Sequence, residues 1–238
     1  MSKTGKLFVG TSGYAYKEWK GSFYPEKIPD QAMLSFYAKH FSTVEINYSF
    51  YRMPTESALQ KWAAEVPPGF RFALKANQRI THIQRLRNCE ESLKRFLEVA
   101  SVLIEGDHLA PILVQLPPNF KFDASLLEDF LAMRPPAFSF AFEVRHASWY
   151  TEQTYDVLRR HQTALCLSET DKQEPPVLVT APFTYARLRL EEYTKKQLSA
   201  WRTRFDNWTA QGLDVYAYCK HEDAGKGAKY AQQILNMA

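Results

Sequence analysis

Eight short β-rich segments recur along the chain, and helix-like segments separate most of them. The eight cover residues 7–10, 43–47, 71–75, 112–116, 140–145, 164–167, 184–188 and 215–219. A strand followed by a helix, repeated along a chain, gives parallel strands joined by right-handed crossovers. Eight such units within 238 residues predict an α/β fold, a single (β/α)₈ TIM-type barrel domain over residues 1–238, since such barrels have about 250 residues. An open, doubly wound parallel sheet is the alternative.

Helix start signals support most of these units. Capping residues are followed by amphipathic segments in six places: Asp30 before 31–40, Thr55 before 56–65, Asn88 (with Glu91) before a helix to Glu105, Asp123 before 124–133, Thr151 before 152–161, and Thr194 before 195–208. A last helical segment is expected over 227–237. The sixth crossover, residues 168–182, contains Pro175-Pro176 and no helical pattern. We therefore expect an atypical loop there, and its role as a lid stays open.

Composition narrows the class of protein. Thirty basic and 26 acidic residues give a net charge of +4, which is too small to indicate nucleic-acid binding by itself. Cys89, Cys166 and Cys219 form no CxxC pair, so neither a disulfide framework nor a zinc site is expected. No apolar stretch follows Lys6 as in a signal peptide, and none approaches the roughly 18 residues of a membrane span. We expect a cytoplasmic protein without membrane contact.

Polar residues interrupt the apolar segments near their carboxyl ends. Buried parallel strands are expected to be apolar throughout, and the exceptions are Glu45 and Asn47, Lys75 and Asn77, Gln115, Glu143 and Arg145, Arg187 and Arg189, and Lys220. Members of each pair are two residues apart and therefore share one face of their strand. Because an unpaired buried charge is costly, we expect this ring to face the barrel mouth, where barrel enzymes place their chemistry. A purely structural layer of ion pairs is the alternative.

The loops after the first, second and fifth strands are rich in aromatic residues. These are Tyr14, Tyr16, Trp19, Phe23, Tyr24, Tyr48, Phe50, Tyr51, Trp149 and Tyr150. Aromatic walls with converging polar groups suit a sugar, a nucleoside or a base. Thr11-Ser12-Gly13 adds backbone amides and hydroxyls that could cradle an anion. Packing of loops against helices is the alternative for each ring.

Several of these motifs, in this order, resemble the domain-of-unknown-function 72 (YecE-like) family. They are Gly10-Thr11-Ser12-Gly13-Tyr14 with Trp19, Gly21 and Phe23-Tyr24-Pro25; Thr43-Val44-Glu45-Ile46-Asn47 with Phe50-Tyr51 and Pro54; Phe72 with Lys75-Ala76; Thr81-His82; Gln115-Leu116-Pro117-Pro118; Glu143-Val144-Arg145-His146 with Ser148-Trp149; and Tyr185 with Arg187-Leu188. The resemblance spans nearly the whole chain. It implies a TIM-type barrel with a pocket at the strand carboxyl ends, and it implies no particular reaction.

Two segments depart from the pattern of the family that the chain resembles. Many members continue the seventh strand into a His-Gly pair, where this chain has Arg189-Leu190. Many end the eighth strand with paired asparagines, where this chain has Lys220-His221-Glu222-Asp223. The resemblance therefore implies a sub-branch with a more charged pocket, whose ligand should not be transferred from other members.

The leading functional hypothesis is a protein that binds or acts on a small anionic, phosphate-bearing ligand. Cationic side chains would hold the anion, since arginine suits bidentate phosphate contacts; a carboxylate would act as general base and a histidine would transfer a proton. The predicted catalytic residues are Glu45, Glu143 and His146. The predicted ligand-binding residues are Ser12, Tyr14, Asn47, Lys75, His82, Gln115, Arg145, Trp149, Arg187 and Lys220. No cofactor is predicted, and whether the protein is an enzyme stays open.

Two other functions remain open. The first is a metal-dependent phosphodiesterase acting on nucleic acid, with one or two divalent ions held by ligands from among Glu45, Glu143, His146, Glu169, Asp171, His221 and Asp223. No HxH or HExxH spacing supports it, and Lys75 and Arg145 would repel a cation. The second is a non-catalytic protein that binds a metabolite or a partner. A permissive fold does not choose among these, and the oligomeric state is not indicated.

Overall fold

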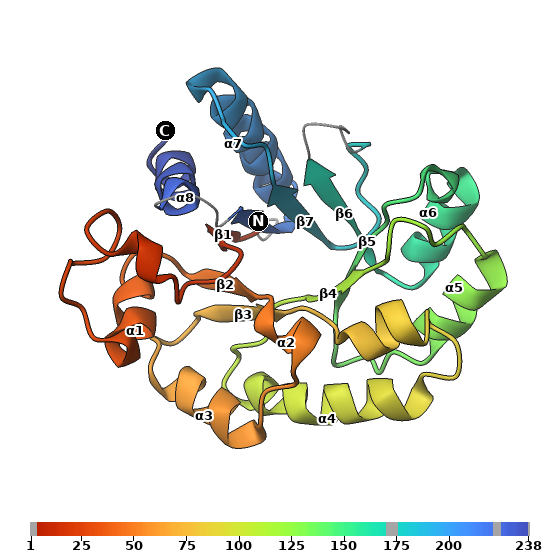
Figure 1. The fold of residues 1–238 in the computed structure, drawn as a ribbon. Helices are drawn as coiled ribbons and strands as arrows, with labels where there is room; N and C mark the ends of the chain where they lie inside the picture. Colours follow the sequence, from red (N-terminus) through yellow and green to blue (C-terminus); the bar gives the residue numbers. More distant parts are fainter. Residues whose placement is uncertain (1–3, 170–175, 221–224, 238) are drawn as a thin grey trace.

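The computed structural model describes residues 4–169, 176–220 and 225–237. Eight strands are present at the predicted places: β1 Leu7–Thr11, β2 Thr43–Ile46, β3 Arg71–Leu74, β4 Ile112–Gln115, β5 Phe140–Glu143, β6 Ala164–Glu169, β7 Phe183–Leu188 and β8 Asp214–Cys219. Figure 1 shows the helices arranged around the outside of these strands. The chain therefore has the α/β organisation that the alternation of segments predicts.

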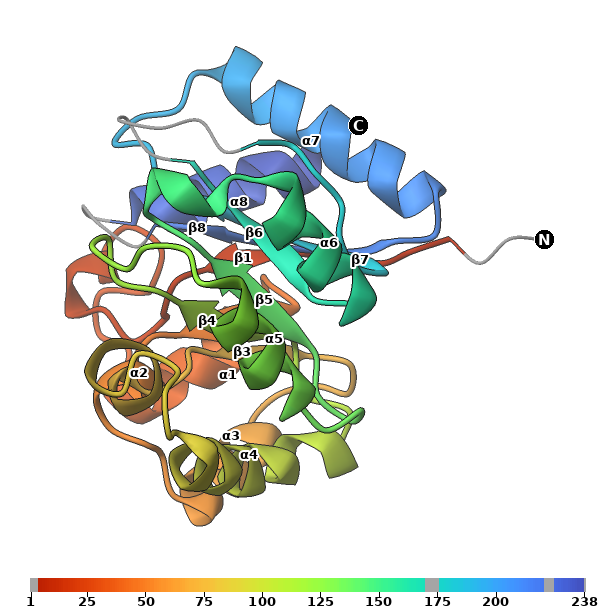
Figure 2. The same ribbon diagram turned by 90° about the vertical axis from the view of Figure 1, so that its right-hand side faces the viewer.

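Helices connect most consecutive strands. The α-helices are α1 Met33–Tyr37, α2 Tyr48–Tyr51, α3 Glu56–Ala64, α4 Glu90–Glu105, α5 Ala124–Ala132, α6 Glu152–Arg160, α7 Lys195–Ala210 and α8 Lys226–Asn236. Short 3-10 turns are η1 Lys17–Trp19, η2 Asp30–Ala32 and η4 Ala147–Trp149, and a π-helical turn, η3, spans Arg79–Ile83. In Figure 2, α7 and α8 lie on one side of the strands, and α3 and α4 lie on the opposite side.

All strand pairings are parallel, but the hydrogen-bond ladders divide the strands into two sheets. Six strands follow the order β1-β8-β7-β6-β5-β4, and β2 pairs with β3 in a separate two-stranded sheet. Isolated parallel bridges, Ser12–Glu45 and Lys75–Leu113, lie between the two sheets. The continuous eight-stranded ladder that the sequence predicts is thus found only in part, because isolated bridges replace a ladder: one between the β1 and β2 segments, and two, Phe72–Leu109 and Lys75–Leu113, between the β3 and β4 segments.

A glycine permits the close approach of β1 to β2. A Cβ atom placed on Gly10 would lie 2.1 Å from the backbone oxygen of Thr43. Real Cβ atoms do not approach a backbone oxygen this closely, so a side chain at residue 10 would push the two strands apart. Tyr37 reinforces the junction, since its hydroxyl accepts from the amide of Thr11 (2.9 Å) and donates to the oxygen of Thr43 (3.0 Å).

Most predicted helix starts are confirmed. Thr55, Asp123, Thr151 and Thr194 each cap the helix that follows with a side-chain oxygen, as N-cap residues do. Two predicted starts are wrong: Asp30 lies inside the turn η2, with α1 beginning at Met33, and α4 begins at Glu90, with Cys89 instead of Asn88 as its N-cap residue. Asn88 has a φ of 46°, in the left-handed region, because the turn before α4 bends sharply.

Apolar side chains form two buried clusters. The larger one lies between the strands and the surrounding helices. The smaller one is built from strand residues on the opposite face and includes Phe8, Ala73, Ala110, Leu113, Ala141, Ala164, Cys166, Phe183, Tyr185, Tyr216 and Tyr218. Strands buried on both faces explain why the β-rich segments are apolar without alternation.

Other sequence expectations concern the cysteines and the sixth crossover. Cys89, Cys166 and Cys219 are buried free thiols, as expected. Within the described part of the crossover between β6 and β7, residues 176–182, no helix is present. The rest of that loop lies outside the described residues. No helix among the described residues has the length and apolar character needed to cross a membrane.

Candidate functional site

A layer of polar side chains continues the smaller apolar cluster toward the carboxyl ends of the strands. Its members lie two residues beyond inward-facing residues of the same strands: Lys75 follows Ala73, Gln115 follows Leu113, Glu143 follows Ala141, and Arg187 follows Tyr185. Side chains two apart on a strand share a face. On β2, Glu45 lies two residues beyond Thr43, whose hydroxyl contacts that of Tyr218 at 2.8 Å. We call Glu45, Lys75, Gln115, Glu143 and Arg187 the polar layer.

Arg187 lies at the centre of the polar layer. Its Nη1 donates to Oε2 of Glu143 at 2.6 Å and to Oε1 of Gln115 at 3.3 Å, and its Nη2 donates to Oε1 of Glu45 at 2.8 Å. Arg187, Glu45 and Glu143 are at most 1% exposed. An arginine buried this deeply requires carboxylate partners, and β2 and β5 each supply one.

Three further groups complete the bonding of the two glutamates. The Tyr185 hydroxyl donates to Oε2 of Glu45 at 2.8 Å, and the Asn47 amide donates to its Oε1 at 3.3 Å. Arg145 donates from Nε to Oε1 of Glu143 at 3.0 Å. The side chain of Arg145 is 36% exposed, so it is the point at which this buried network reaches solvent.

This bonding fixes the ionisation of both glutamates. Burial opposes ionisation of Glu45, but Arg187 and the Tyr185 hydroxyl outweigh it and lower the pKa of Glu45. For Glu143, Arg187 and Arg145 likewise overcome burial and lower the pKa to about 2. A carboxylate with a depressed pKa and occupied oxygens is a weak base. The geometry therefore gives these two residues a role in holding Arg187 and Arg145, and offers little support for the predicted general base.

Within the part of the chain that the structure describes, basic side chains outnumber carboxylates around the polar layer. Two negative residues, Glu45 and Glu143, act electrostatically on four basic residues: Lys75, Arg145, Arg187 and Arg189. Among the described residues, no carboxylate forms an ion pair with Lys75 or Arg189. Burial and Arg187 lower the pKa of Arg189, as expected for a cation with too little negative charge around it.

Lys75 is the one amine of the polar layer. Its side chain is partly buried, and its Nζ lies 4.0 Å from the centroid of the Phe50 ring. Burial and the Arg187 guanidinium lower the pKa of Lys75 to about 8, although Glu45 and Glu143 act in the opposite direction. The Phe50 ring face attracts the ammonium form and so works against this shift. Near pH 8, Lys75 would exist partly as the neutral amine.

His82 packs on Phe50 as well. The two rings meet edge to face with centroids 4.9 Å apart. The Nδ1 atom of His82 contacts the Thr81 hydroxyl at 2.8 Å. Burial, together with the charge of nearby Lys75, lowers the pKa of His82, so its imidazole is neutral at pH 7. Of the two predicted histidines, His82 is the one with an electrostatic link to the polar layer.

The loop that carries His82 has an unusual backbone. His82 belongs to the π-helical turn η3, and Arg85 and Leu86 follow with φ angles of 52° and 65°. π-helical turns and left-handed non-glycine residues are both enriched at functional sites. Leu86 is nevertheless well anchored, since it is 2% exposed and its amide donates to the oxygen of Ile80 at 3.0 Å.

Three predicted site residues make mainly structural contacts. His146 caps η4, its Nδ1 accepting from the Ser148 amide at 3.2 Å, and none of its hydrogen bonds reaches the polar layer. Trp149 is 0% exposed and donates to the Phe120 oxygen at 2.6 Å, so its ring packs in the core. Tyr14 is partly buried, packs on Tyr37 and accepts from Tyr24 at its backbone oxygen.

Two other predicted ligand-binding residues, Ser12 and Lys220, directly follow β1 and β8. Ser12 is 1% exposed and pairs through its backbone with Glu45. Lys220, at the end of β8, lines a cavity of about 280 Å³ together with Leu188, Glu192 and Tyr230. Phe50, Tyr185 and Arg189 contact or act on the polar layer, although the sequence analysis noted them without counting them among the predicted site residues. The two-residue spacing from Arg187 identifies Arg189 as a member of the same strand face.

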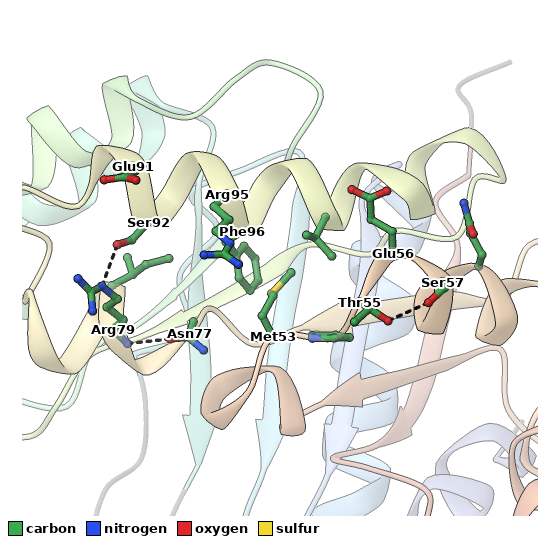
Figure 3. Close-up of a pocket in the computed structure, with 14 residues that line it drawn as sticks. Met53, Thr55, Glu56, Ser57, Asn77, Arg79, Glu91, Ser92, Arg95 and Phe96 are labelled. Atoms are coloured by element: carbon green, nitrogen blue, oxygen red, sulfur yellow. Dashed lines mark hydrogen bonds between the residues drawn. The ribbon is translucent and has the colours of Figure 1, made fainter.

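A larger cavity lies outside the polar layer. It has a volume of about 970 Å³, and its lining includes Thr55, Arg79, Ser92 and Arg95. Figure 3 shows Arg79 donating to Ser92, at 3.3 Å, beside α4. Asn77, two residues after Lys75, lies on its wall, but none of the predicted ligand-binding residues does. This cavity and the charged network are thus separate features.

The described residues contain no group of three or more histidines, cysteines and carboxylates placed to hold a metal ion. Glu169, a candidate metal ligand, instead accepts from Tyr193 at 2.6 Å and from the Trp201 indole at 3.0 Å. Asp171, His221 and Asp223, which the phosphodiesterase hypothesis also needs, lie outside the described residues.

Comparison with known proteins agrees with the motifs around this network. The model of the family described as "Protein of unknown function DUF72" matches residues 8–238. The chain belongs to this family. The DUF72 protein of Thermotoga maritima MSB8 has a similar structure, with a TM-score of 0.85 and 25% identity over 98% of each chain. The resemblance that the motifs carry is confirmed.

Curated members of the same family also carry no functional name. The chain is 23% identical to UPF0759 protein YunF of Bacillus subtilis (strain 168), over 97% of this chain and 94% of YunF. It is 31% identical to UPF0759 protein YecE of Escherichia coli (strain K12) over 117 residues, which are 49% of this chain and 42% of YecE. An AP endonuclease, family 2, from Brucella melitensis has a similar fold, with a TM-score of 0.57 at 8% identity, covering 95% of this chain and 97% of the other. At that identity the likeness concerns the fold alone.

Proposed function

We propose that this DUF72 protein binds a small, phosphate-bearing anion at the carboxyl ends of its strands, within one (β/α)₈-type barrel formed by both sheets. The observation that carries the proposal is the excess of basic side chains around two glutamates that Arg187 already holds. Lys75, Arg145 and Arg189, which we call the cationic group, would contact the anion. Carboxyl ends of parallel strands are where barrels of this type place their ligands.

The chemistry of the cationic group suits phosphate. A guanidinium offers parallel N–H donors that match two phosphate oxygens, and an ammonium adds a point charge. Arg145 already uses its Nε on Glu143, which orients its guanidinium. A bound dianion would balance the two surplus positive charges in a partly buried site, where electrostatic attraction is stronger than in water.

The remaining polar residues divide into two roles. Glu45, Glu143 and Arg187 would form the fixed base of the site, since all three are buried and bonded to each other. Asn47 is partly buried at the edge of this base and has an amide that could contact a neutral part of the ligand. In this division the cationic group selects a negatively charged ligand, and the buried residues hold the site rigid.

Thermal unfolding tests the proposal with inorganic phosphate, sugar phosphates and nucleotides. A ligand at 100 times its Kd adds about 2.7 kcal/mol, which raises the Tm of a chain of this length by several degrees. The shift should be lost in Arg189→Met and kept in Arg159→Met, which removes an exposed arginine of α6. If no phosphorylated compound shifts the Tm, or if Arg189→Met responds as the wild type does, the proposal is wrong.

A further inference from the structure

We propose that Lys75 is a nucleophile that forms an imine with the carbonyl carbon of an anionic aldehyde or ketone. This inference rests on the proposed function, because the anionic end of the compound would be held by Arg145 and Arg189. It names a substrate class, phosphorylated or similarly anionic carbonyl compounds, and a covalent step. The evidence comes from the position of Lys75, the occupation of its neighbours, its protonation and the adjacent histidine.

The position of Lys75 suits a reacting group. It follows β3 directly, and its backbone is fixed on both sides: its amide donates to the Ile46 oxygen at 3.2 Å and its own oxygen accepts from the Ser49 hydroxyl at 2.7 Å. The Nζ atom lies over Phe50, which is only 8% exposed. A long flexible side chain is thereby held against an apolar surface, which reduces the freedom it would lose on reaction.

The neighbouring carboxylates are bonded to groups other than Lys75. Both oxygens of Glu143 are taken, one by Arg187 and one by Arg145. Glu45 is held in the same way by Arg187 and Tyr185. Within the described part of the chain Lys75 has no ion pair. A lysine that served only to neutralise buried charge would be expected to contact one of these oxygens.

The environment also raises the fraction of the neutral amine, which is the reactive form. Burial and Arg187 lower the pKa of Lys75 to about 8, whereas the ordinary lysine pKa is about 10.4. Desolvation beside another cationic group is a recognised way to activate a lysine. The charged groups that act on Lys75 are Arg187, Glu45, Glu143 and Arg145, and the charge of Lys75 in turn acts on His82.

His82 could move the protons that imine formation requires. The neutral amine of Lys75 donates its lone pair to the carbonyl carbon, and one of its two protons passes to the carbonyl oxygen, which gives a carbinolamine. The remaining nitrogen proton is then lost, the hydroxyl gains a proton and leaves as water, and the C=N bond of the imine forms, with no oxidant or reductant. His82 contacts the same Phe50 ring and has a lowered pKa, so it could accept one proton and return the other.

Reductive trapping tests this proposal with the full-length protein. Pyridoxal 5′-phosphate is the anionic aldehyde probe, and pyridoxal, which lacks the phosphate, is its matched control. Borohydride fixes any imine as a stable amine, and mass spectrometry of the peptide containing residue 75 measures the yield. We expect at least tenfold more modification at Lys75 than at Lys94, a surface residue of α4 whose side chain is 78% exposed. We also expect the phosphate-bearing probe to exceed pyridoxal at Lys75 and excess inorganic phosphate to suppress the reaction.

The outcomes separate this inference from the proposed function. If phosphate binding depends on Arg189 but Lys75 is modified no more than Lys94, the proposal of imine formation is overturned and the anion site stands. Lys75 could instead be trapped equally well by pyridoxal, with no suppression by inorganic phosphate. That result would overturn the anion site and keep Lys75 as a nucleophile. Lys75→Arg should abolish the trapped product in the peptide that contains residue 75, whereas Lys94→Arg, at the exposed control lysine, should leave the wild-type yield at Lys75 unchanged.

Discussion

Nη2 of Arg187 lies 2.8 Å from Oε1 of Glu45, and both side chains are buried. Arg187 belongs to β7 in the six-stranded sheet, whereas Glu45 belongs to β2 in the two-stranded sheet. The pair therefore joins the two sheets at their carboxyl ends, where their hydrogen-bond ladders do not meet. Arg187 also binds Glu143, so one guanidinium links three strands and supports the cationic group above it.

Removal of Arg187 should strongly destabilise the protein. Arg187→Met leaves Glu45 and Glu143 buried without their main partner, and breaking a buried ion pair from one side costs about 3–5 kcal/mol. Chemical denaturation at pH 7 measures the free energy of unfolding. Arg159→Met, which breaks exposed ion pairs with Asp156 and Glu152, should cost under about 1 kcal/mol. Equal losses in the two variants would contradict a supporting role for Arg187.

Acid should weaken the fold through Glu143. Its folded pKa is about 2, below the ordinary value of 4.5, so its ionisation stabilises the folded state above pH 4.5. That stabilisation, on the order of 3 kcal/mol, should be lost progressively as the pH falls from 4.5 toward 2. Urea unfolding across this range should show a flatter pH dependence in Glu143→Gln. An equally steep dependence in the variant would show that other carboxyls cause the loss.

A methyl group at residue 10 should separate β1 from β2. Gly10→Ala places a Cβ against the backbone oxygen of Thr43, and overpacking of this kind costs about 1–3 kcal/mol or more. Gly21→Ala is the control, because its Cβ meets no atom within 4 Å and carries only the left-handed backbone cost of about 1 kcal/mol. Thermal unfolding should give a clearly lower Tm for Gly10→Ala than for Gly21→Ala. The reverse order would contradict the close junction of the two strands.

The amine of Lys75 should react with an acylating reagent at lower pH than an ordinary lysine. Because the pKa of Lys75 is about 8, its acylation rate should stop rising above about pH 9. The acylation rate of Nα-acetyl-lysine, whose pKa is about 10.4, should continue to rise. Quantitative mass spectrometry of the residue-75 peptide gives the profile. Glu143→Gln removes a negative charge near Lys75, so the midpoint should fall further. A midpoint near 10 in the wild type would contradict the activated amine.

The strands and most helix starts could be predicted from the sequence because their signals are local. A short apolar segment predicts a strand, and a threonine or Asp123 in front of an amphipathic segment predicts the start of a helix. Asn88 was misleading, since an asparagine serves equally as an N-cap and as a left-handed turn residue. The isolated bridges at Ser12, Phe72 and Lys75 could not be foreseen, because the length of a hydrogen-bond ladder depends on the whole packed sheet.

The polar layer was predictable because a charge inside an apolar strand needs a structural reason. The positions of polar residues within the apolar segments identified Glu45, Lys75, Glu143 and Arg187. They did not show which of these charges form ion pairs and which could contact a ligand. That distinction depends on side-chain geometry across four strands. The environment of the aromatic residues could not be predicted in this way, because the same ring can line a ligand pocket or pack in the core. The prediction of a ligand wall at Trp149 therefore conflicts with its full burial against Phe120.

Calorimetric titration with inorganic phosphate tests the anion site most directly. Wild-type protein is compared with Arg145→Met/Arg189→Met, which removes two members of the cationic group. The matched control is Arg159→Met/Arg160→Met on α6, which has the same net charge and loses only arginines that are 40% and 59% exposed. We predict that the wild type and the α6 variant bind phosphate alike, and that the Arg145/Arg189 variant binds at least tenfold more weakly, or about 1.4 kcal/mol. Equal affinity in all three proteins, or no binding to any of them, would contradict the proposed anion site.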